Sequence, residues 1–594
     1  MLQILNPFYM KKYIIVLLIE VCYLTAFSQV NEEHLPNYLT PKEENNLPFY
    51  VKPMPKGITH PPVSPIRNTA EWEEMQAVLV SWKSGYETFL SEIVRYAREE
   101  AKVYIYCSDS TTVKNYLTSH SISTQNTAYI QTPMNSVWIR DYGPNNIYTN
   151  DVDSLYLVDW VYNRPRPLDD ASPALFATRI GVPLYECTQP PTDLVATGGN
   201  FMSDGFHTAF SSHLILDENA SVTAYNQTPK TEADINNIVN DYLGITRYIK
   251  MENLPYDGIH HIDMHIKLLN EETLLVGQYP TGISDGPQIE TNLNYILNNF
   301  NSVFGTPYKI VRIPMPPNQS SPLWPSGGGD YLTYTNSLII NKTVLVPTYY
   351  QQYDTTALRI YREAMPGYKV IGINSNSIIY QSGAIHCTTH EIGVFNPLLI
   401  SHQGLPNTDN IWTNYQVNAT IMHVSGISSA LIYYRTDTLL PYLSASMILT
   451  DVINNTWTGE IPVQTSGTTV YYYIWAQATS GKTQVRPMPA PLGYWKFLVY
   501  NPNQVQELNT QNFSMYYYPQ GNNNINIIIH SGYDLTANIS LVNILGQKVL
   551  DIYNGKWTQG TQEFSFSRNG LSSGMYLIKT ETNRGTLVSK IFLN

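Results

Sequence analysis

Short apolar segments alternate with segments of helical spacing from about Val63 to Leu398. The run Met75–Trp82 is typical of a buried strand, whereas Glu87–Glu100 places its apolar residues three and four positions apart, as one face of a helix requires. The alternation continues with a strand at Val103–Cys107 and with helices after the capping pair Thr231 and Asp234, at Ile289–Phe300 and at Thr355–Met365. The pattern predicts an α/β domain over residues 63–398.

Beyond Leu398 the pattern changes to strict alternation of apolar and polar residues, with turn signals at regular spacing. Five segments show it: Tyr415–Met422, Ser429–Arg435, Trp457–Pro462, Thr469–Trp475 and Tyr494–Tyr500. Short strands of this kind favour an immunoglobulin-like β-sandwich, which we place at residues 399–501. After a linker at Asn501–Gln504, further strand-like runs predict a small C-terminal β-sandwich over residues 508–594.

The N-terminal region has the pattern of a targeting segment. Lys11 and Lys12 precede the apolar run Tyr13–Phe27, and Ala26-Phe27-Ser28 resembles a cleavage site before Gln29. We therefore expect residues 1–28 to be a signal peptide and the protein to be exported. Residues 29–62 are polar and rich in proline, which is typical of an extended arm or a propeptide. No later stretch is apolar enough to span a bilayer as a helix.

Composition narrows the possibilities further. The chain has 594 residues, a net charge of -12 and no basic block, which argues against a nucleic-acid partner. If Cys22 leaves with the signal, Cys107, Cys187 and Cys387 remain, and an odd number leaves at least one thiol unpaired. No His/Cys spacing suggests zinc, so we expect neither a metal nor another cofactor.

A weak internal repeat runs through residues 63–398. Gly-rich or acidic turns, each followed by a two-strand pattern, recur at Thr197–Phe201, His261–His265, Ser326–Tyr331 and Ser382–Cys387. This spacing indicates repeated units around a centre. The alternative is a single α/β sheet with no internal symmetry.

Candidate chemistry lies at the same turns and at Trp138–Pro144. Asp141 offers a carboxylate and the neighbouring Trp138 offers a flat ring, and together they suit a planar cation such as a guanidinium. The alternative is an ordinary Arg-Asp ion pair and a Trp at a domain edge. His261 and Asp263 would share one face of a strand. A thiol at Cys387, a histidine and two carboxylates together can attack an electron-poor carbon.

Four motifs in this order resemble the guanidino-group-modifying superfamily, and within it the agmatine deiminases and the bacterial secreted peptidylarginine deiminases. They are Trp138–Pro144, Thr197–Asn200, His261–Asp263 and Ser382–Cys387. The resemblance implies a five-bladed pseudo-symmetric α/β propeller with a central site. It also implies that Asp141 and Asp263 clamp the guanidinium, that His261 is the acid and then the base, and that Cys387 is the nucleophile. Asn336 matches a polar position of that site, with Asn341 as the competitor.

The residues themselves support the same chemistry. A Cys387 thiolate would attack the guanidinium carbon, and His261 would protonate the departing ammonia and then activate a water that releases citrulline from the thiouronium. Two nearby carboxylates raise the pKa of the thiol above its ordinary value of about 8.5, so a cationic substrate would complete thiolate formation.

Arg164 and Arg166 bear on the choice of substrate. They flank a proline in an extended stretch, so both can face one pocket and bind a carboxylate, while exposed charge on a loop is the alternative. The resemblance implies that this pair reads the C-terminal carboxylate of a peptide ending in arginine. Thr197 also departs from the acidic residue that agmatine deiminases carry before Gly-Gly-Asn.

The C-terminal segments Gly546–Val549 and Leu571–Ile578 resemble the sorting domain of type IX secretion. This resemblance implies contact with the secretion machinery, transfer across the outer membrane, removal of the domain, and a secreted or surface-attached product. The expected function is thus hydrolysis of peptidyl-arginine, with arginine-containing peptides and proteins as substrates. Two alternatives stay open: a deiminase of agmatine or another small guanidine, and a non-catalytic surface adhesin.

Overall fold

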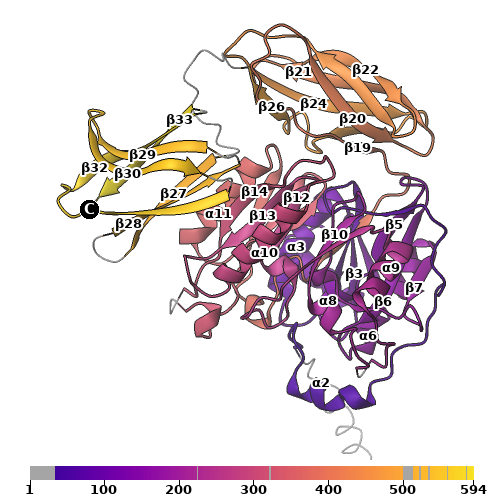
Figure 1. Ribbon diagram of the computed structural model, residues 1–594. Coiled ribbons are helices and arrows are strands. Elements are labelled where there is room, and N and C mark those ends of the chain that lie inside the picture. The colour runs from indigo at the N-terminus through magenta and orange to yellow at the C-terminus, as the bar shows by residue number, and fades with distance from the viewer. Residues whose placement is uncertain are drawn as a thin grey trace, which may run out of the picture.

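The computed structural model describes residues 34–223, 225–319, 323–499, 513–520, 524–532, 535–557, 560–583 and 585–593. The predicted signal peptide, residues 29–33 of the arm and the linker Asn501–Gln504 lie outside these ranges. Figure 1 shows a mixed α/β region, a β-rich region beyond it and a smaller β module at the C-terminus.

Between residues 66 and 393 the described strands form five sheets. In chain order of their first members they are β1 (Ile66–Asn68), β5 (Asn145–Thr149), β6 (Leu155–Tyr162), β7 (Leu184–Cys187) and β8 (Val195–Ala196); β2 (Met75–Ser81), β3 (Lys102–Cys107), β4 (Thr127–Gln131) and β18 (His390–Gly393); β9 (Met202–Ser203), β10 (Thr208–Ser212) and β11 (Arg247–Met251); β12 (Ile266–Asn270), β13 (Thr273–Gln278) and β14 (Lys309–Pro314); and β15 (Leu338–Ile340), β16 (Thr343–Thr348) and β17 (Lys369–Asn374).

One pairing pattern recurs in all five sheets. A first strand pairs antiparallel with a second, and the second pairs parallel with a third: β5-β6-β7, β18-β2-β3, β9-β10-β11, β12-β13-β14 and β15-β16-β17. The parallel step needs a crossover, and helices supply it. The internal repeat in the sequence is thus a repeat of strand pairing.

The four predicted helices are present as α3 (Glu87–Glu100), α9 (Glu232–Leu243), α10 (Gly286–Asn299) and α11 (Gln351–Ala364). Two further helices, α4 (Ser110–Ser119) and α7 (Ser172–Ile180), were not predicted. Helix α3 buries the apolar side that its pattern predicted, including Phe89, Ile93 and Ala97. Helix α9 begins at the predicted capping pair, since Thr231 accepts from the Asp234 amide and the Asp234 side chain accepts in return. Strand β2 is buried along nearly its whole length, which explains its uninterrupted apolar run.

Asp141 lies in a single helical turn, α5 (Ile139–Tyr142), in which the Gly143 amide donates to the Ile139 carbonyl at 2.9 Å before Pro144. One local prediction was wrong: His261 and Asp263 do not share a strand, since Ile262–Met264 forms a 3-10 turn, η3. A second 3-10 turn, η2 (Gly198–Asn200), carries the Gly-Gly-Asn motif.

The region after Leu398 is all-β. One sheet runs in the order β19-β20-β23-β22-β21-β24-β25, with β26 beside β24. Its strands are β19 (Leu399–Ser401), β20 (Tyr415–Met422), β21 (Ile427–Arg435), β22 (Leu443–Asp451), β23 (Thr456–Ile461), β24 (Thr469–Ala478), β25 (Thr483–Arg486) and β26 (Trp495–Leu498). The five predicted strands are present as β20, β21, β23, β24 and β26, and β19, β22 and β25 are additions. Arg486 joins this region to the α/β region by donating to the Trp72 carbonyl at 2.9 Å.

Two further sheets, β27-β28-β31 and β30-β29-β32-β33, form the C-terminal module around one apolar core. Their strands are β27 (Phe513–Gln520), β28 (Asn524–Ser531), β29 (Leu535–Asn543), β30 (Lys548–Trp557), β31 (Gly560–Ser567), β32 (Gly574–Thr582) and β33 (Gly585–Leu593). In the part of the chain that the structure describes, no helix is both long and apolar enough to cross a bilayer.

The described part of the proline-rich arm runs along the α/β region and contains one short helix, α2 (Pro41–Asn46), at the lower end of Figure 1. Thr40 and Glu43 form a capping box at the start of this helix. Asn37 is fully buried, so this part of the arm packs on the α/β region.

Candidate active site

Five equivalent turns bring the candidate residues together. In four sheets a candidate residue lies a few positions before the first strand of the recurring pattern: Asp141 before β5, Asp263 before β12, Asn336 before β15 and Cys387 before β18. In the fifth, the Gly-Gly-Asn turn lies before β9 and contacts the site through the Gly199 amide, which donates to Asp141 Oδ1. The four candidate side chains are buried, and each of the five sheets places one turn at the site.

The Cys387 thiol lies at the centre of these contacts. Its Sγ is 3.1 Å from Asn336 Nδ2 and 3.5 Å from Asp263 Oδ2. The Asn336 side-chain Oδ1 accepts from the amides of Ala384 and Cys387, which holds the cysteine turn in place. Burial raises the pKa of Cys387 well above its ordinary value, the charges of Asp263 and Asp141 raise it further, and the Asn336 contact partly opposes them. The resting thiol is therefore protonated at neutral pH.

The two aspartates are held differently. Asp141 Oδ1 accepts from the Gly199 amide at 3.1 Å, and Asp263 Oδ2 accepts from His386 Nδ1 at 2.7 Å. Burial raises the pKa of Asp141, whereas for Asp263 the opposing effect of burial is outweighed by the hydrogen bond and charge of His386, and its pKa is lowered. Among the described residues, neither Asp141 Oδ2 nor Asp263 Oδ1 has a hydrogen-bond partner. Each carboxylate thus keeps one oxygen for a ligand.

His261 is fully buried and lies beside Asp141, with 3.6 Å between its Nδ1 and Asp141 Oδ1. Within the described chain neither ring nitrogen makes a hydrogen bond. Burial lowers the pKa of His261, and the nearby charges of Asp141 and Asp263 partly oppose that effect. A neutral imidazole with both nitrogens free can receive and return a proton.

Trp138 packs beside the thiol. A Cβ added to Gly383 would lie 2.5 Å from the Trp138 ring and 3.1 Å from Cys387 Sγ, so the indole and the thiol approach this glycine from two sides. The indole is fully buried, and its Nε1 donates to the Leu35 carbonyl at 2.8 Å. The Trp138 ring therefore lies close to the thiol and to the N-terminal arm.

Arg164 and Arg166 are also buried, which contradicts the alternative of exposed loop charge. Both contact the N-terminal arm: Arg164 Nε donates to the Asn37 carbonyl at 3.0 Å, and Arg166 binds the Glu43 carboxylate, with 2.7 Å between Nε and Oε1. The pair faces one common surface, as its spacing predicted, and the arm covers that surface.

The contacts of the two candidate asparagines distinguish their roles. Asn336 contacts the thiol, whereas Asn341 accepts from the Met75 amide and donates to the carbonyls of Met75 and Glu100. Asn341 also has a left-handed φ of 50°, which asparagine tolerates better than most residues. Asn341 therefore stabilises a turn, and Asn336 belongs to the site.

Sequence reasoning missed a network behind the site. His386 Nε2 lies 3.2 Å from Glu71 Oε2, so the two ring nitrogens connect Asp263 to Glu71. Lys267 donates to the same Glu71 oxygen at 2.6 Å, while Arg140 pairs with Glu391 rather than with Asp141. The position of His386 next to Cys387 was an available signal, whereas Glu71 carried none because it is far away in sequence.

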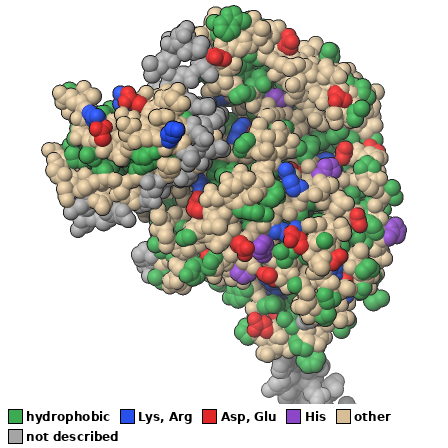
Figure 2. Space-filling model, in the orientation of Figure 1, with side chains coloured by type: hydrophobic (Ala, Val, Ile, Leu, Met, Phe, Trp, Pro, Cys, Tyr) green, Lys and Arg blue, Asp and Glu red, His purple; other side chains and the backbone are tan. Residues whose placement is uncertain are grey.

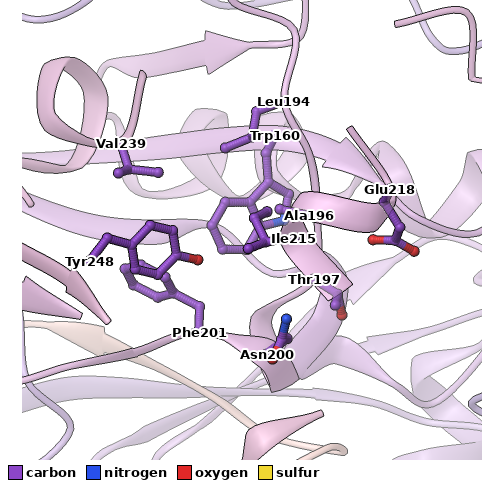
Figure 3. A pocket seen from close by; sticks show the side chains of 10 residues that line it. All are labelled: Trp160, Leu194, Ala196, Thr197, Asn200, Phe201, Ile215, Glu218, Val239 and Tyr248. Carbon is purple, nitrogen blue, oxygen red and sulfur yellow. The ribbon is translucent and has the colours of Figure 1, made fainter. Parts of the chain in front are cut away.

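Two cavities flank the site. A cavity of about 50 Å³ lies behind Asp263 and is lined by His386, Glu71 and Arg140, among others. A smaller one of about 10 Å³, with room for about one water, lies behind the η2 turn. Figure 3 shows Thr197 and Asn200 of that turn facing the rings of Trp160, Phe201 and Tyr248.

The described part of the chain contains no group of three or more His, Cys, Asp or Glu side chains that could hold a metal ion.

Cys107, Cys187 and Cys387 are all free thiols. Burial raises the pKa of Cys107 to about 11, with a further contribution from the charge of Asp109.

Comparison with known proteins places this site in a family. Residues 67–392, more than half of the chain, match the model of the Porphyromonas-type peptidyl-arginine deiminases, so the chain belongs to this family of guanidino-group deiminases. Residues 516–594 match the secretion system C-terminal sorting domain. This domain marks the protein for type IX export and a secreted or cell-surface location.

Two relatives named "Putative agmatine deiminase" are similar to the same part of the chain. That of Vibrio parahaemolyticus is 23% identical over 363 residues, which is 54% of this chain and 95% of the relative. That of Legionella pneumophila is 24% identical over 348 residues, again 54% of this chain, and 94% of the relative. Among solved structures, the agmatine deiminase of C. jejuni aligns at 20% identity and a TM-score of 0.47, covering 56% of this chain and 97% of that one.

The two asparagines give a first test. Replacing Asn336 with Ala should lower turnover about a hundredfold, because it removes a donor aimed at the sulfur, and should change stability less. Asn341→Ala should lower the free energy of unfolding by on the order of 3 kcal/mol, because it leaves three backbone groups unpaired, with little effect on turnover by the folded protein. Citrulline assays and thermal melts check both, and equal loss of turnover in the two variants would contradict the assignment.

Gly199 gives a second test with a matched control. A Cβ at this position would overlap the His261 ring and lie 2.9 Å from Asp141 Oδ1, so Gly199→Ala should lower turnover at least about tenfold by displacing both groups. Gly258→Ala, three residues before His261, meets open space and should change stability by no more than about 0.5 kcal/mol. Steady-state kinetics of both variants decide the matter: normal turnover by Gly199→Ala would show that the turn does not set the site geometry.

Proposed function

We propose that this protein converts peptidyl-arginine, in particular a C-terminal arginine, to peptidyl-citrulline and ammonia through a thiouronium intermediate on Cys387. The observation that carries the proposal is the pair of buried carboxylates beside the thiol, each with one free oxygen. A buried anion without a partner is unfavourable, and a planar cation with several N–H donors would satisfy both carboxylates at once.

In the proposed mechanism the substrate cation activates its own nucleophile. A guanidinium bound by Asp141 and Asp263 offsets the negative charge that adds to burial in raising the pKa of Cys387, so the thiol can pass its proton to the neutral His261 imidazole. The thiolate then forms a carbon–sulfur bond at the guanidinium carbon. Asn336 Nδ2, at 3.1 Å, stabilises the anionic sulfur before attack.

His261 would handle the protons of both halves of the reaction. It gives a proton to the departing nitrogen, the carbon–nitrogen bond breaks and ammonia leaves. It then takes a proton from a water that adds to the thiouronium carbon, the carbon–sulfur bond breaks, and citrulline and the thiolate are released. The free ring nitrogens of His261 and its place beside Asp141 support this role.

We further propose that the five sheets between residues 63 and 398 are the blades of a propeller whose axis passes through the site. The recurring strand pairing supports this arrangement, because each sheet contributes its residue from an equivalent turn. Residues 399–501 would be the immunoglobulin-like sandwich and residues 508–594 the sorting module.

Selection of a C-terminal arginine would depend on Arg164 and Arg166. Their guanidinium groups already bind carbonyl oxygens and a carboxylate of the arm, so the geometry suits such acceptors. The α-carboxylate of a terminal arginine offers the same chemistry, whereas agmatine has no carboxylate. The similarity to proteins named as agmatine deiminases keeps a small-guanidine substrate as the second candidate.

The test compares ammonia release from four substrates: a peptide ending in Arg, its amide, the same peptide with one residue added, and agmatine. The wild type should prefer the free acid by about ten- to a hundredfold, because each charge-assisted hydrogen bond contributes on the order of 1.5–3 kcal/mol. Replacing both Arg164 and Arg166 with Ala should remove most of this preference, and Cys387→Ala should abolish turnover of every substrate. Equal wild-type rates on acid, amide and internal arginine would exclude carboxylate reading, and a preference for agmatine would favour the second candidate.

A further inference from the structure

The arginine pair is occupied by the chain's own N-terminal segment, here defined as Leu35–Asn46. Arg166 is almost fully enclosed by it: Nε and Nη2 bind the two oxygens of Glu43 at 2.7 and 3.2 Å, and Nη2 also donates to the carbonyls of Pro36 and Tyr38. This is a two-pronged pairing of a guanidinium with a carboxylate, the geometry in which such a pair is strongest.

The same segment reaches across to the thiol side of the site. Trp138 Nε1 donates to the Leu35 carbonyl, and Arg164 Nε donates to the Asn37 carbonyl. The Asn37 amide donates to the Gln381 carbonyl at 2.9 Å, and its side chain donates to the Ser382 carbonyl at 3.3 Å. Gln381 and Ser382 begin the turn that ends at Cys387, so the segment bridges the arginine pair and the nucleophile turn.

Local sequence sets the position of Glu43. Pro41 is at the first turn of α2, and Thr40 caps the helix by accepting from the Glu43 amide while the Glu43 carboxylate accepts from Thr40. Burial raises the pKa of Glu43, but the hydrogen bond and charge of Arg166 outweigh it, so the pKa is lowered and the carboxylate is ionised at neutral pH. Figure 2 shows acidic side chains at the lower end of the molecule, where α2 lies in Figure 1.

The connection after the segment is anchored at alternate residues. Phe49, Val51 and Met54 are each more than 80% exposed, whereas Tyr50 donates to Asp170 at 3.2 Å and Lys52 pairs with Asp193 at 3.3 Å. Release of residues 35–46 would therefore break the polar contacts at the arginine pair while Tyr50 and Lys52 still hold the rest of the arm.

We infer that the N-terminal segment is an intramolecular ligand that closes the active site, with the Glu43 carboxylate in the place of the substrate's C-terminal carboxylate. This inference rests on the proposed function, because it assigns the same arginine pair to two mutually exclusive ligands. The segment and a peptide ending in Arg compete for Arg166, so the enzyme with its segment bound is inactive and the segment must leave before substrate enters.

The direct test removes the charge of Glu43 and keeps its helix. In Glu43→Gln the side chain can still complete the capping box, but it no longer neutralises Arg166. Glu44→Gln is the matched control. Glu44 lies in the same helical turn and is exposed, and in the described part of the chain its side chain bonds neither arginine. With a peptide ending in Arg, Glu43→Gln should lower KM about tenfold with kcat unchanged, and Glu44→Gln should match the wild type. Identical KM values in the two variants would overturn the inference.

A second measurement does not depend on turnover. Hydrogen exchange of the full-length Cys387→Ala protein should show faster exchange across residues 35–46 when a peptide ending in Arg is added, because the peptide displaces the segment. Unchanged exchange at a saturating concentration of that peptide would contradict displacement.

The two proposals fail in distinguishable ways. If the segment closes the site but the arginines do not read a carboxylate, Glu43→Gln will activate the acid and the amide equally. If the arginines read a carboxylate but the segment is only structural, the wild type will prefer the acid while Glu43→Gln shows a lower melting temperature and an unchanged KM.

Discussion

Two buried carboxylates without a cation between them are the constraint on which this site depends. Asp141 and Asp263 face a buried thiol, and each has one oxygen without a partner in the described structure. Burial and then the charge of these carboxylates raise the pKa of Cys387 well above its ordinary value. In the proposed mechanism, substrate recognition and activation of the nucleophile are one event, since the guanidinium that satisfies the carboxylates also favours the thiolate.

The rest of the structure holds this unfavourable arrangement in place. Five turns, each before the first strand of a repeated sheet, fix the reacting groups, and His386 with Glu71 fixes Asp263 from behind. Arg164 and Arg166 carry the opposite charge, and the N-terminal segment binds both, with Glu43 as the anion of Arg166. Under the proposed function, the acidic pair and the basic pair together would bind a terminal arginine, which carries a cation at one end and a carboxylate at the other.

Much of this could be predicted from the sequence, because periodicity and short motifs are local. The helix at Glu87–Glu100 and the strand Tyr415–Met422 have the predicted bounds, and Asp141, His261, Asp263, Asn336 and Cys387 do come together. The rest depends on contacts that the sequence does not show. His261 and Asp263 lie around a 3-10 turn rather than on a strand, and the proline-rich pattern of the arm gave no sign that Glu43 binds Arg166. Asn336 was named from the sequence, but only its position beside the sulfur distinguishes it from Asn341.

The most direct test of substrate-activated chemistry is the rate at which Cys387 is alkylated by two reagents of the same shape, a neutral haloacetamide and a cationic haloacetamidine, in the protein without substrate. We expect the cationic reagent to react at least about tenfold faster at pH 7, and we expect Asp141→Asn and Asp263→Asn to abolish this difference. The rate of the neutral reagent should rise with pH up to pH 9, because the pKa of the thiol is raised. Mass spectrometry must assign the label to Cys387, since Cys107 and Cys187 are also free thiols. Equal rates for the two reagents, or a rate of the neutral reagent that is already at its plateau at pH 7, would contradict substrate-activated chemistry.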